Sequence, residues 1–221
     1  MKSEFWHERW ETNQLGFHQP EVNRLLMEHW PALGLPADCP VFVPLCGKSL
    51  DMSWLRAAGH PIKGVEFSPI AIRDFFAENQ IEASTSSEGA LECSTGSGYE
   101  LYCGDFFDIT PKILATVRAV YDRASLIALP PELRQRYAAH LIQSLPREIT
   151  IMLITLEYDS SRMNGPPHSV PASEVETLFG EAFTIETLWS SGPETPTERF
   201  RERGLDSWCE TVWRLDRGET R

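Results

Sequence analysis

The 221-residue sequence has little basic charge, no closely spaced cysteine pair and no long apolar run. Its net charge of -12 leaves no basic face for phosphate contacts, so we expect no nucleic-acid partner. Its longest apolar stretch, residues 149–156, is too short to span a bilayer, so we expect no membrane partner. The five cysteines form no C-x-x-C motif, which disfavours a disulfide framework and indicates a reducing, cytoplasmic location.

Two further absences concern a leader segment and a metal. Charged residues near the start, Lys2 and Glu4 among them, interrupt the apolar core that a secretory signal requires. The six histidines show no metal-ligand spacing, so we predict no metal. A chain of this length can bury a full core without covalent staples. We therefore expect one domain over residues 1–221, acting as a monomer.

Short apolar runs alternate with helical patterns along most of the chain, which is typical of an α/β fold with a mostly parallel sheet and helices on both faces. Residues 1–35 carry aromatic and aliphatic residues at helical spacing and predict a helical arm before the sheet. Residues 84–98 are rich in Ser, Thr, Gly and Glu and predict loops around a hairpin. Seven strands are expected, at residues 41–45, 62–67, 99–103, 119–122, 150–156, 183–189 and 208–215.

The most informative segment runs from Val41 to Glu66. A strand pattern breaks at a turn containing Gly47, a helical pattern follows, and a second strand ends on Glu66. In an open α/β sheet the first turn lets a ligand approach the backbone, and an acid about 20 residues later can accept both hydroxyls of a ribose. The segment therefore predicts a cofactor that contains a nucleoside.

Three nucleoside ligands compete for this turn. A phosphate loop for a nucleoside triphosphate needs a glycine five residues before Gly47, where the sequence has Phe42. A dinucleotide favours G-x-G-x-x-G, whereas this turn has one glycine. S-adenosylmethionine has no phosphate and needs only backbone contacts, an acid and an apolar slot. The pattern favours S-adenosylmethionine.

Each part of S-adenosylmethionine has a candidate partner in the sequence. The backbone of Leu45 can meet the methionine moiety, and Glu66 can accept the ribose hydroxyls. Asp105 and Phe106 follow the third strand and can flank the adenine. Trp10 in the N-terminal arm can cover the sulfonium through a cation–π contact.

Several of these segments resemble the thiopurine S-methyltransferase family, most closely its bacterial branch, over nearly the whole chain. The segments are Trp10 with Gly16-Phe17-His18-Gln19, Val43-Pro44-Leu45-Cys46-Gly47-Lys48, Gly64-Val65-Glu66, Leu101-Tyr102-Cys103, Tyr121-Asp122-Arg123 and Gly165-Pro166-Pro167. The resemblance implies the class I methyltransferase fold, which is Rossmann-like, with S-adenosyl-L-methionine as cofactor. It implies cofactor contacts at Trp10, Leu45, Glu66 and Arg123, and adenine contacts at Asp105 and Phe106.

On the acceptor side the resemblance implies that Phe17 faces the substrate and that Arg199 lies in a substrate-side arginine segment. The implied reaction is in-line S-methylation of small aromatic or heterocyclic thiols, thiopurines among them. We assign no catalytic residue, because holding the acceptor sulfur in line with the methyl group itself supplies much of the rate enhancement. A guanidinium, from Arg123 or Arg199, would favour the thiolate.

Other interpretations stay open at this point. Inorganic or small organic selenium and tellurium species are an alternative acceptor class, and a non-catalytic module that binds an adenosine ligand is a second alternative. Taken singly, Glu66 can be a solvated acid, Arg123 can pair with Asp122, and Arg199 can belong to a solvated surface.

Overall fold

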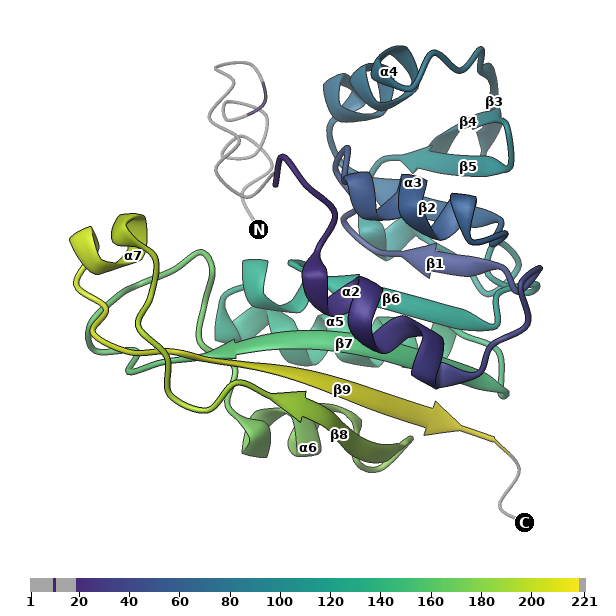
Figure 1. Cartoon of the computed structure of the whole chain (residues 1–221). Coiled ribbons are helices and arrows are strands. Elements are labelled where there is room, and N and C mark those ends of the chain that lie inside the picture. The colour runs from purple at the N-terminus through teal and green to yellow at the C-terminus, as the bar shows by residue number, and fades with distance from the viewer. Residues whose placement is uncertain (1–9, 11–18, 219–221) are drawn as a thin grey trace. The chain divides into compact units, whose positions relative to one another are not determined.

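The structure, a computed structural model, describes residues 10 and 19–218 (Figure 1). The chain divides into two compact units. The N-terminal unit comprises residues 2–121 with 144–146, and the C-terminal unit comprises residues 122–143 with 147–221.

The N-terminal unit contains a parallel group of strands extended by an antiparallel hairpin. Strand β1 (Val41–Val43) pairs in parallel with β2 (Ile62–Glu66) and with β6 (Ala119–Arg123), whose last two residues belong to the C-terminal unit. Strand β2 pairs in parallel with β5 (Tyr99–Cys103). Beyond β5 lie β4 (Leu91–Gly96) and β3 (Ser84–Glu88), both antiparallel to their neighbours. The carboxyl ends of β1, β2 and β5 therefore point the same way.

Helices of the N-terminal unit begin where the sequence supplies a cap. Ser49 accepts a hydrogen bond from the amide of Asp51 at the start of α3, and Ser68 and Pro69 occupy the first positions of α4. Asn23 caps the short helix that precedes β1. The helical segments are α2 (Arg24–His29), η1 (Trp30–Leu33), α3 (Leu50–Ala57), α4 (Pro69–Glu78) and η2 (Phe106–Asp108).

The C-terminal unit is built on antiparallel strands. Strand β9 (Cys209–Arg217) lies between β7 (Ile149–Glu157) and β8 (Thr184–Ser190) and is antiparallel to both (Figure 1). Strand β7 is buried over most of its length, as its apolar sequence predicts. The remaining elements of this unit are η3 (Leu126–Ala128), α5 (Pro131–Ser144), α6 (Ala172–Phe179) and α7 (Glu198–Glu202). The last residue of α5, Ser144, belongs to the N-terminal unit.

The prediction of seven strands is wrong, because the described residues form nine. The two additional strands are β3 and β4, in the segment predicted as loops around a hairpin. The residues of β3 are Ser, Thr, Ser, Ser and Glu, and four of the five are exposed, so the strand has no apolar face to reveal it. In β4 the burial of Leu91 and Cys93 on either side of exposed Glu92 is the period-two pattern that could have identified it.

Most of the predicted helical arm over residues 1–35 lies outside the described residues, although α2 and η1 fall within its range. No helix in the described part of the chain is long and apolar enough to cross a membrane. Residues 10 and 19–218 contain no cluster of side chains that could hold a metal ion. All five cysteines are free thiols, and Cys39, Cys46 and Cys93 are buried.

Candidate functional site

The turn after β1 adopts an unusual backbone conformation. Leu45 has φ of 46°, and Gly47 has φ of 54°. A positive φ at a non-glycine residue such as leucine is uncommon, costs about 1 kcal/mol or more, and tends to occur at functional sites. The amide of Cys46 donates to the carbonyl of Val65 at 3.0 Å, which holds the turn against the end of β2.

The close approach of this turn to β2 depends on Gly64. A Cβ added at Gly64 would lie 2.8 Å from Sγ of Cys46 and 2.9 Å from Cδ2 of Leu101. Any side chain here would push the Cys46 thiol away from β2. Burial, followed by the charge of Glu66, raises the pKa of the Cys46 thiol well above its usual value, so this cysteine acts as a packing residue rather than a nucleophile.

Glu66 is held between the turn and the start of α4. Its side chain is buried, with 7% of the residue's surface exposed, and its Oε2 accepts from the amide of Gly47 at 2.9 Å. Its Oε1 accepts from the amide of Ser68 at 2.8 Å. Burial raises the pKa of Glu66, and the surrounding backbone amides oppose that rise. A carboxylate has about four lone-pair positions, so two amide bonds leave it able to accept further donors.

Ser68 adds a second polar group beside this carboxylate. The residue is fully buried, and its Oγ has no hydrogen-bond partner among the described residues. Although Ser68 stands at the N-cap position of α4, its side chain makes no capping bond. We name Leu45, Gly47, Glu66 and Ser68 the first-turn cluster.

Trp10 lies against the first-turn cluster. Only 5% of its surface is exposed, and a Cβ added at Gly47 would lie 3.4 Å from Cζ2 of its indole ring. The structure therefore brings Trp10, Gly47 and Glu66 together.

Asp105 and Phe106 follow the end of β5. The amide of Gly104 donates to the Glu66 carbonyl at 3.0 Å, which joins this segment to the end of β2. Asp105 is exposed and its side chain caps η2 by accepting from the amide of Phe107 at 2.9 Å, whereas Phe106 is buried. The two predicted adenine neighbours thus occupy a strand end next to that of Glu66.

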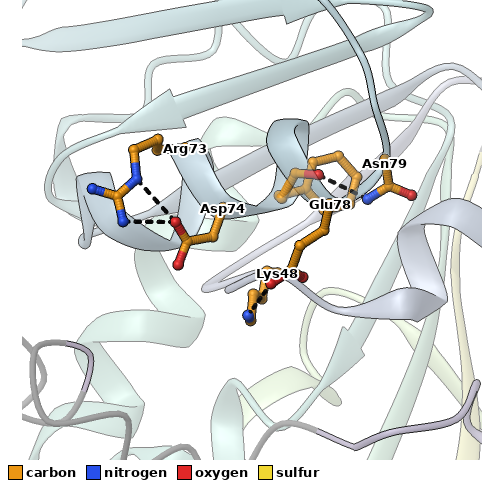
Figure 2. A network of polar contacts seen from close by, with 6 residues as sticks. Lys48, Arg73, Asp74, Glu78 and Asn79 are labelled. Atoms are coloured by element: carbon orange, nitrogen blue, oxygen red, sulfur yellow. Dashed lines mark hydrogen bonds and ion pairs between the residues drawn. The ribbon is translucent and has the colours of Figure 1, made fainter.

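Lys48 forms an ion pair with Glu78. Its Nζ lies 2.5 Å from Oε1 of Glu78 near the end of α4, and Figure 2 shows the two side chains meeting there. Arg73 and Asp74 form another pair on the same helix. The charge of Lys48 is therefore balanced by Glu78, and Glu66 is held by backbone amides.

Arg123 is the last residue of β6 and is half-buried. It is preceded by Asp122, which is 1% exposed and accepts from the hydroxyl of Tyr137 at 2.7 Å and from the amide of Leu126 at 3.2 Å. Burial raises the pKa of Asp122, and these donors oppose the rise. Ala124, with φ of 66°, turns the chain immediately after Arg123. Asp122 thus holds the turn that follows Arg123.

Of the two predicted substrate-side residues, Arg199 lies within the described residues. Arg199 is exposed on α7, and its guanidinium lies 5.7 Å from the centre of the Phe200 ring. Arg203 lies 5.6 Å from the centre of the same ring, and its Nη1 donates to the carbonyl of Pro166 at 3.1 Å. Phe17 lies outside the described residues.

A family model described as "Thiopurine S-methyltransferase (TPMT)" matches residues 1–218. The chain belongs to the thiopurine S-methyltransferase family. The thiopurine S-methyltransferase of Pseudomonas fluorescens (strain Pf0-1) is 46% identical over 215 residues, which cover 97% of this chain and 99% of that one. The protein of the same name from Methylococcus capsulatus (strain ATCC 33009 / NCIMB 11132 / Bath) is 46% identical over 217 residues, 97% of each chain.

Solved structures show the fold of this family member. The Burkholderia thailandensis 1,6-didemethyltoxoflavin-N1-methyltransferase, solved with S-adenosylhomocysteine, matches with a TM-score of 0.65 at 14% identity, covering 97% of this chain and 87% of its own. A methyltransferase described as S-adenosylmethionine-dependent, from Anabaena variabilis, matches with a TM-score of 0.64 at 13% identity and covers 98% and 95%. The chain is therefore an S-adenosylmethionine-dependent methyltransferase with the α/β methyltransferase fold.

The first-turn cluster fits this cofactor. A single glycine and a leucine at positive φ give a turn that exposes backbone without forming a phosphate cradle. The fixed carboxylate of Glu66 keeps acceptor positions for hydroxyl donors. When bound, the cofactor supplies an electrophilic methyl group on a sulfonium.

The sequence assigned no role to a group of residues in the C-terminal unit, although Pro166 and Pro167 belong to a motif of the resemblance. We name it the loop cluster: Arg134, Tyr158, Pro166, Pro167, His168 and Arg203. Arg134 is 1% exposed, donates from Nη1 to Glu174 at 2.6 Å and from Nε to the Leu129 carbonyl at 3.0 Å. The pattern that could have identified Arg134 is an arginine on the buried face of the amphipathic helix α5.

Proposed function

We propose that this methyltransferase transfers a methyl group to the sulfur of small aromatic or heterocyclic thiols, thiopurines among them. The observation that carries the proposal is similarity at 46% identity, over 97% of the chain, to proteins named thiopurine S-methyltransferase. The placement of Trp10, Gly47 and Glu66 in one cluster supports it, because these residues come from separate motifs of the resemblance.

On the cofactor side, Glu66 is proposed to accept the ribose hydroxyls with the lone pairs that its two amide bonds leave. The backbone of Leu45 meets the methionine moiety, and the indole of Trp10 faces the sulfonium, a contact worth roughly 0.5 to 2 kcal/mol. Asp105 and Phe106 flank the adenine.

On the acceptor side, Arg123 and Arg199 are proposed to favour the thiolate, since a cation within about 4 to 6 Å stabilises the ionised form of an acid. Arg123 is also proposed to contact the cofactor, and Phe17 to face the acceptor. These residues need only align the sulfur with the methyl group, because orientation can supply roughly 7 to 11 kcal/mol.

An acceptor screen with product mass spectrometry tests the proposal. Calorimetry first establishes that the protein binds S-adenosylmethionine, and 6-mercaptopurine, thiophenols, selenite and tellurite are then supplied as acceptors. We expect S-methylated 6-mercaptopurine and thiophenols. Methylation of the selenium or tellurium species alone would replace the thiol proposal, and cofactor binding without any methylated product would overturn it. We further propose a cytoplasmic monomer with a single domain, which size-exclusion chromatography and cooperative unfolding can test.

A further inference from the structure

The loop that follows β7 is attached to the turn that follows β6. The backbone amide of His168 donates to the carbonyl of Ile127 at 2.6 Å, four residues after Arg123. Ligands of open α/β sheets bind beyond the carboxyl ends of the strands. Both segments begin at such an end, and both belong to the C-terminal unit.

The loop is fastened on each side of His168. The hydroxyl of Tyr158 donates to the carbonyl of Pro167 at 2.6 Å, and Arg203 donates to the carbonyl of Pro166 at 3.1 Å. Ser169 accepts from the amide of Tyr158 at 2.9 Å and donates to its carbonyl at 2.8 Å. These bonds give His168 a defined backbone position.

The imidazole ring of His168 also has a defined place. It packs against Gly165, where an added Cβ would lie 2.4 Å from Nδ1 and 2.6 Å from Cγ. The residue is half-buried, and no hydrogen bond within residues 19–218 engages either ring nitrogen. A placed imidazole with a ring nitrogen that makes no hydrogen bond to the described residues can accept one from a ligand.

Charged groups around the ring favour its neutral form. Burial lowers the pKa of His168 below its ordinary 6.5, and the guanidinium groups of Arg134 and Arg203 lower it further, while Glu132 opposes them. Arg134 keeps a second free donor near this site, because its buried Nη2 has no partner in the described part of the chain. At neutral pH the ring can therefore accept a proton in surroundings that stabilise an anion.

We propose that His168 is the base that deprotonates the acceptor, an inference that rests on the proposed thiol methylation. One ring nitrogen takes the proton from the acceptor sulfur, or from the ring nitrogen of a thione tautomer, and the released electron pair stays on the acceptor as a thiolate. The thiolate forms the new bond between sulfur and carbon as the methyl group leaves the sulfonium. The imidazolium then returns its proton to solvent.

The ionisation state of the acceptor distinguishes the two possible roles of His168, a catalytic base and a packing residue. A base matters only while the acceptor is protonated, and 6-mercaptopurine loses its proton just above neutral pH. The experiment compares kcat/KM of the wild type and His168→Gln for this acceptor from about pH 6.5 to about pH 9. Glutamine keeps a hydrogen-bonding group but cannot take the proton.

We expect the variant to be roughly 10-fold slower at the acidic end, because the small fraction of acceptor that is already ionised there still reacts without a base, and to converge with the wild type at the alkaline end. With 4-nitrothiophenol, which is ionised throughout, the two enzymes should differ less than about threefold at every pH. His140→Gln on α5 serves as the matched control, and thermal unfolding establishes that each variant is folded.

The outcomes distinguish this inference from the proposed function. If the wild type methylates neither thiol, the proposed function fails and the inference falls with it. If the wild type methylates both and the ratio of the two enzymes is the same at every pH, His168 is a packing residue. Equal rates of the wild type and His168→Gln with protonated 6-mercaptopurine would likewise overturn the inference.

Discussion

Two buried carboxylates, Glu66 at the end of β2 and Asp122 near the end of β6, have similar surroundings and different partners. Burial raises the pKa of both, and a backbone amide donates to each. Asp122 also accepts from the hydroxyl of Tyr137, whereas the bonds to Glu66 come from amides alone. Beside Glu66, the hydroxyl of Ser68 makes no hydrogen bond within residues 19–218.

The difference separates a structural carboxylate from one suited to binding a ligand. Asp122 uses its acceptor capacity on a side chain of its own unit, so its main effect is on the turn after Arg123. Glu66 is oriented by the backbone and keeps capacity for hydroxyl donors. Substitutions should therefore affect stability at Asp122 and cofactor affinity at Glu66.

The largest effect is expected from Asp122→Ala. The substitution leaves the Tyr137 hydroxyl and the Leu126 amide buried without an acceptor, and each such loss costs about 1 to 3 kcal/mol. We expect the free energy of unfolding to fall by about 2 to 4 kcal/mol in urea titrations. Asp122→Asn keeps one oxygen acceptor and should lose less than half of that. An alanine variant as stable as the wild type would show that the two carboxylates do not differ in this way.

The next effect is expected at the other carboxylate. Glu66→Ala removes a charged acceptor, and we expect the affinity for S-adenosylmethionine to fall by about 1.5 to 3 kcal/mol in calorimetry. Glu66→Gln should lie between the alanine variant and the wild type, because it keeps one oxygen acceptor without the charge. A dissociation constant unchanged in Glu66→Ala would remove this residue from the cofactor site.

The two regions also differ in how much the sequence predicts. The first-turn cluster comes from residues 45–68, and strand ends bring such neighbours together in every open parallel sheet. The turn, the acid and the nature of the cofactor could therefore be predicted. The hydrogen bond from Gly47 to Glu66 could not, because it forms in a turn where Leu45 and Gly47 both have a positive φ, which is uncommon for leucine.

The loop cluster was missed for the opposite reason. Its members are separated by up to 69 positions, from Arg134 to Arg203. Tyr158 and Arg203 bond to the backbone carbonyls of Pro167 and Pro166, which any residue could supply. A short-range pattern does not encode such contacts. The segment of β3 and β4 was predicted as loops around a hairpin, and its two strands were not counted because β3 has no apolar face.

A smaller effect is expected on the acceptor side at Arg199. Removal of its exposed guanidinium should make the thiolate harder to form, so the pH of half-maximal rate should rise in Arg199→Ala by less than about one unit, which corresponds to 1.36 kcal/mol. Arg201→Ala, on the same short helix and also exposed, is the matched control. Coincident pH–rate profiles of Arg199→Ala and the wild type would assign Arg199 to the solvated surface.

The smallest effect is expected from the ion pair between Lys48 and Glu78, which lies beside the first-turn cluster without contributing to it. Lys48 is 12% exposed and Glu78 54% exposed, so solvent screens the pair, and such pairs contribute about 0.2 to 1 kcal/mol. Glu78→Gln should lower the stability by no more than that, with the difference disappearing in about 1 M salt. Because amides hold Glu66, cofactor affinity should stay within about twofold of the wild type. A loss as large as that of Glu66→Ala would mean that Lys48, freed from Glu78, redirects its charge to the buried carboxylate.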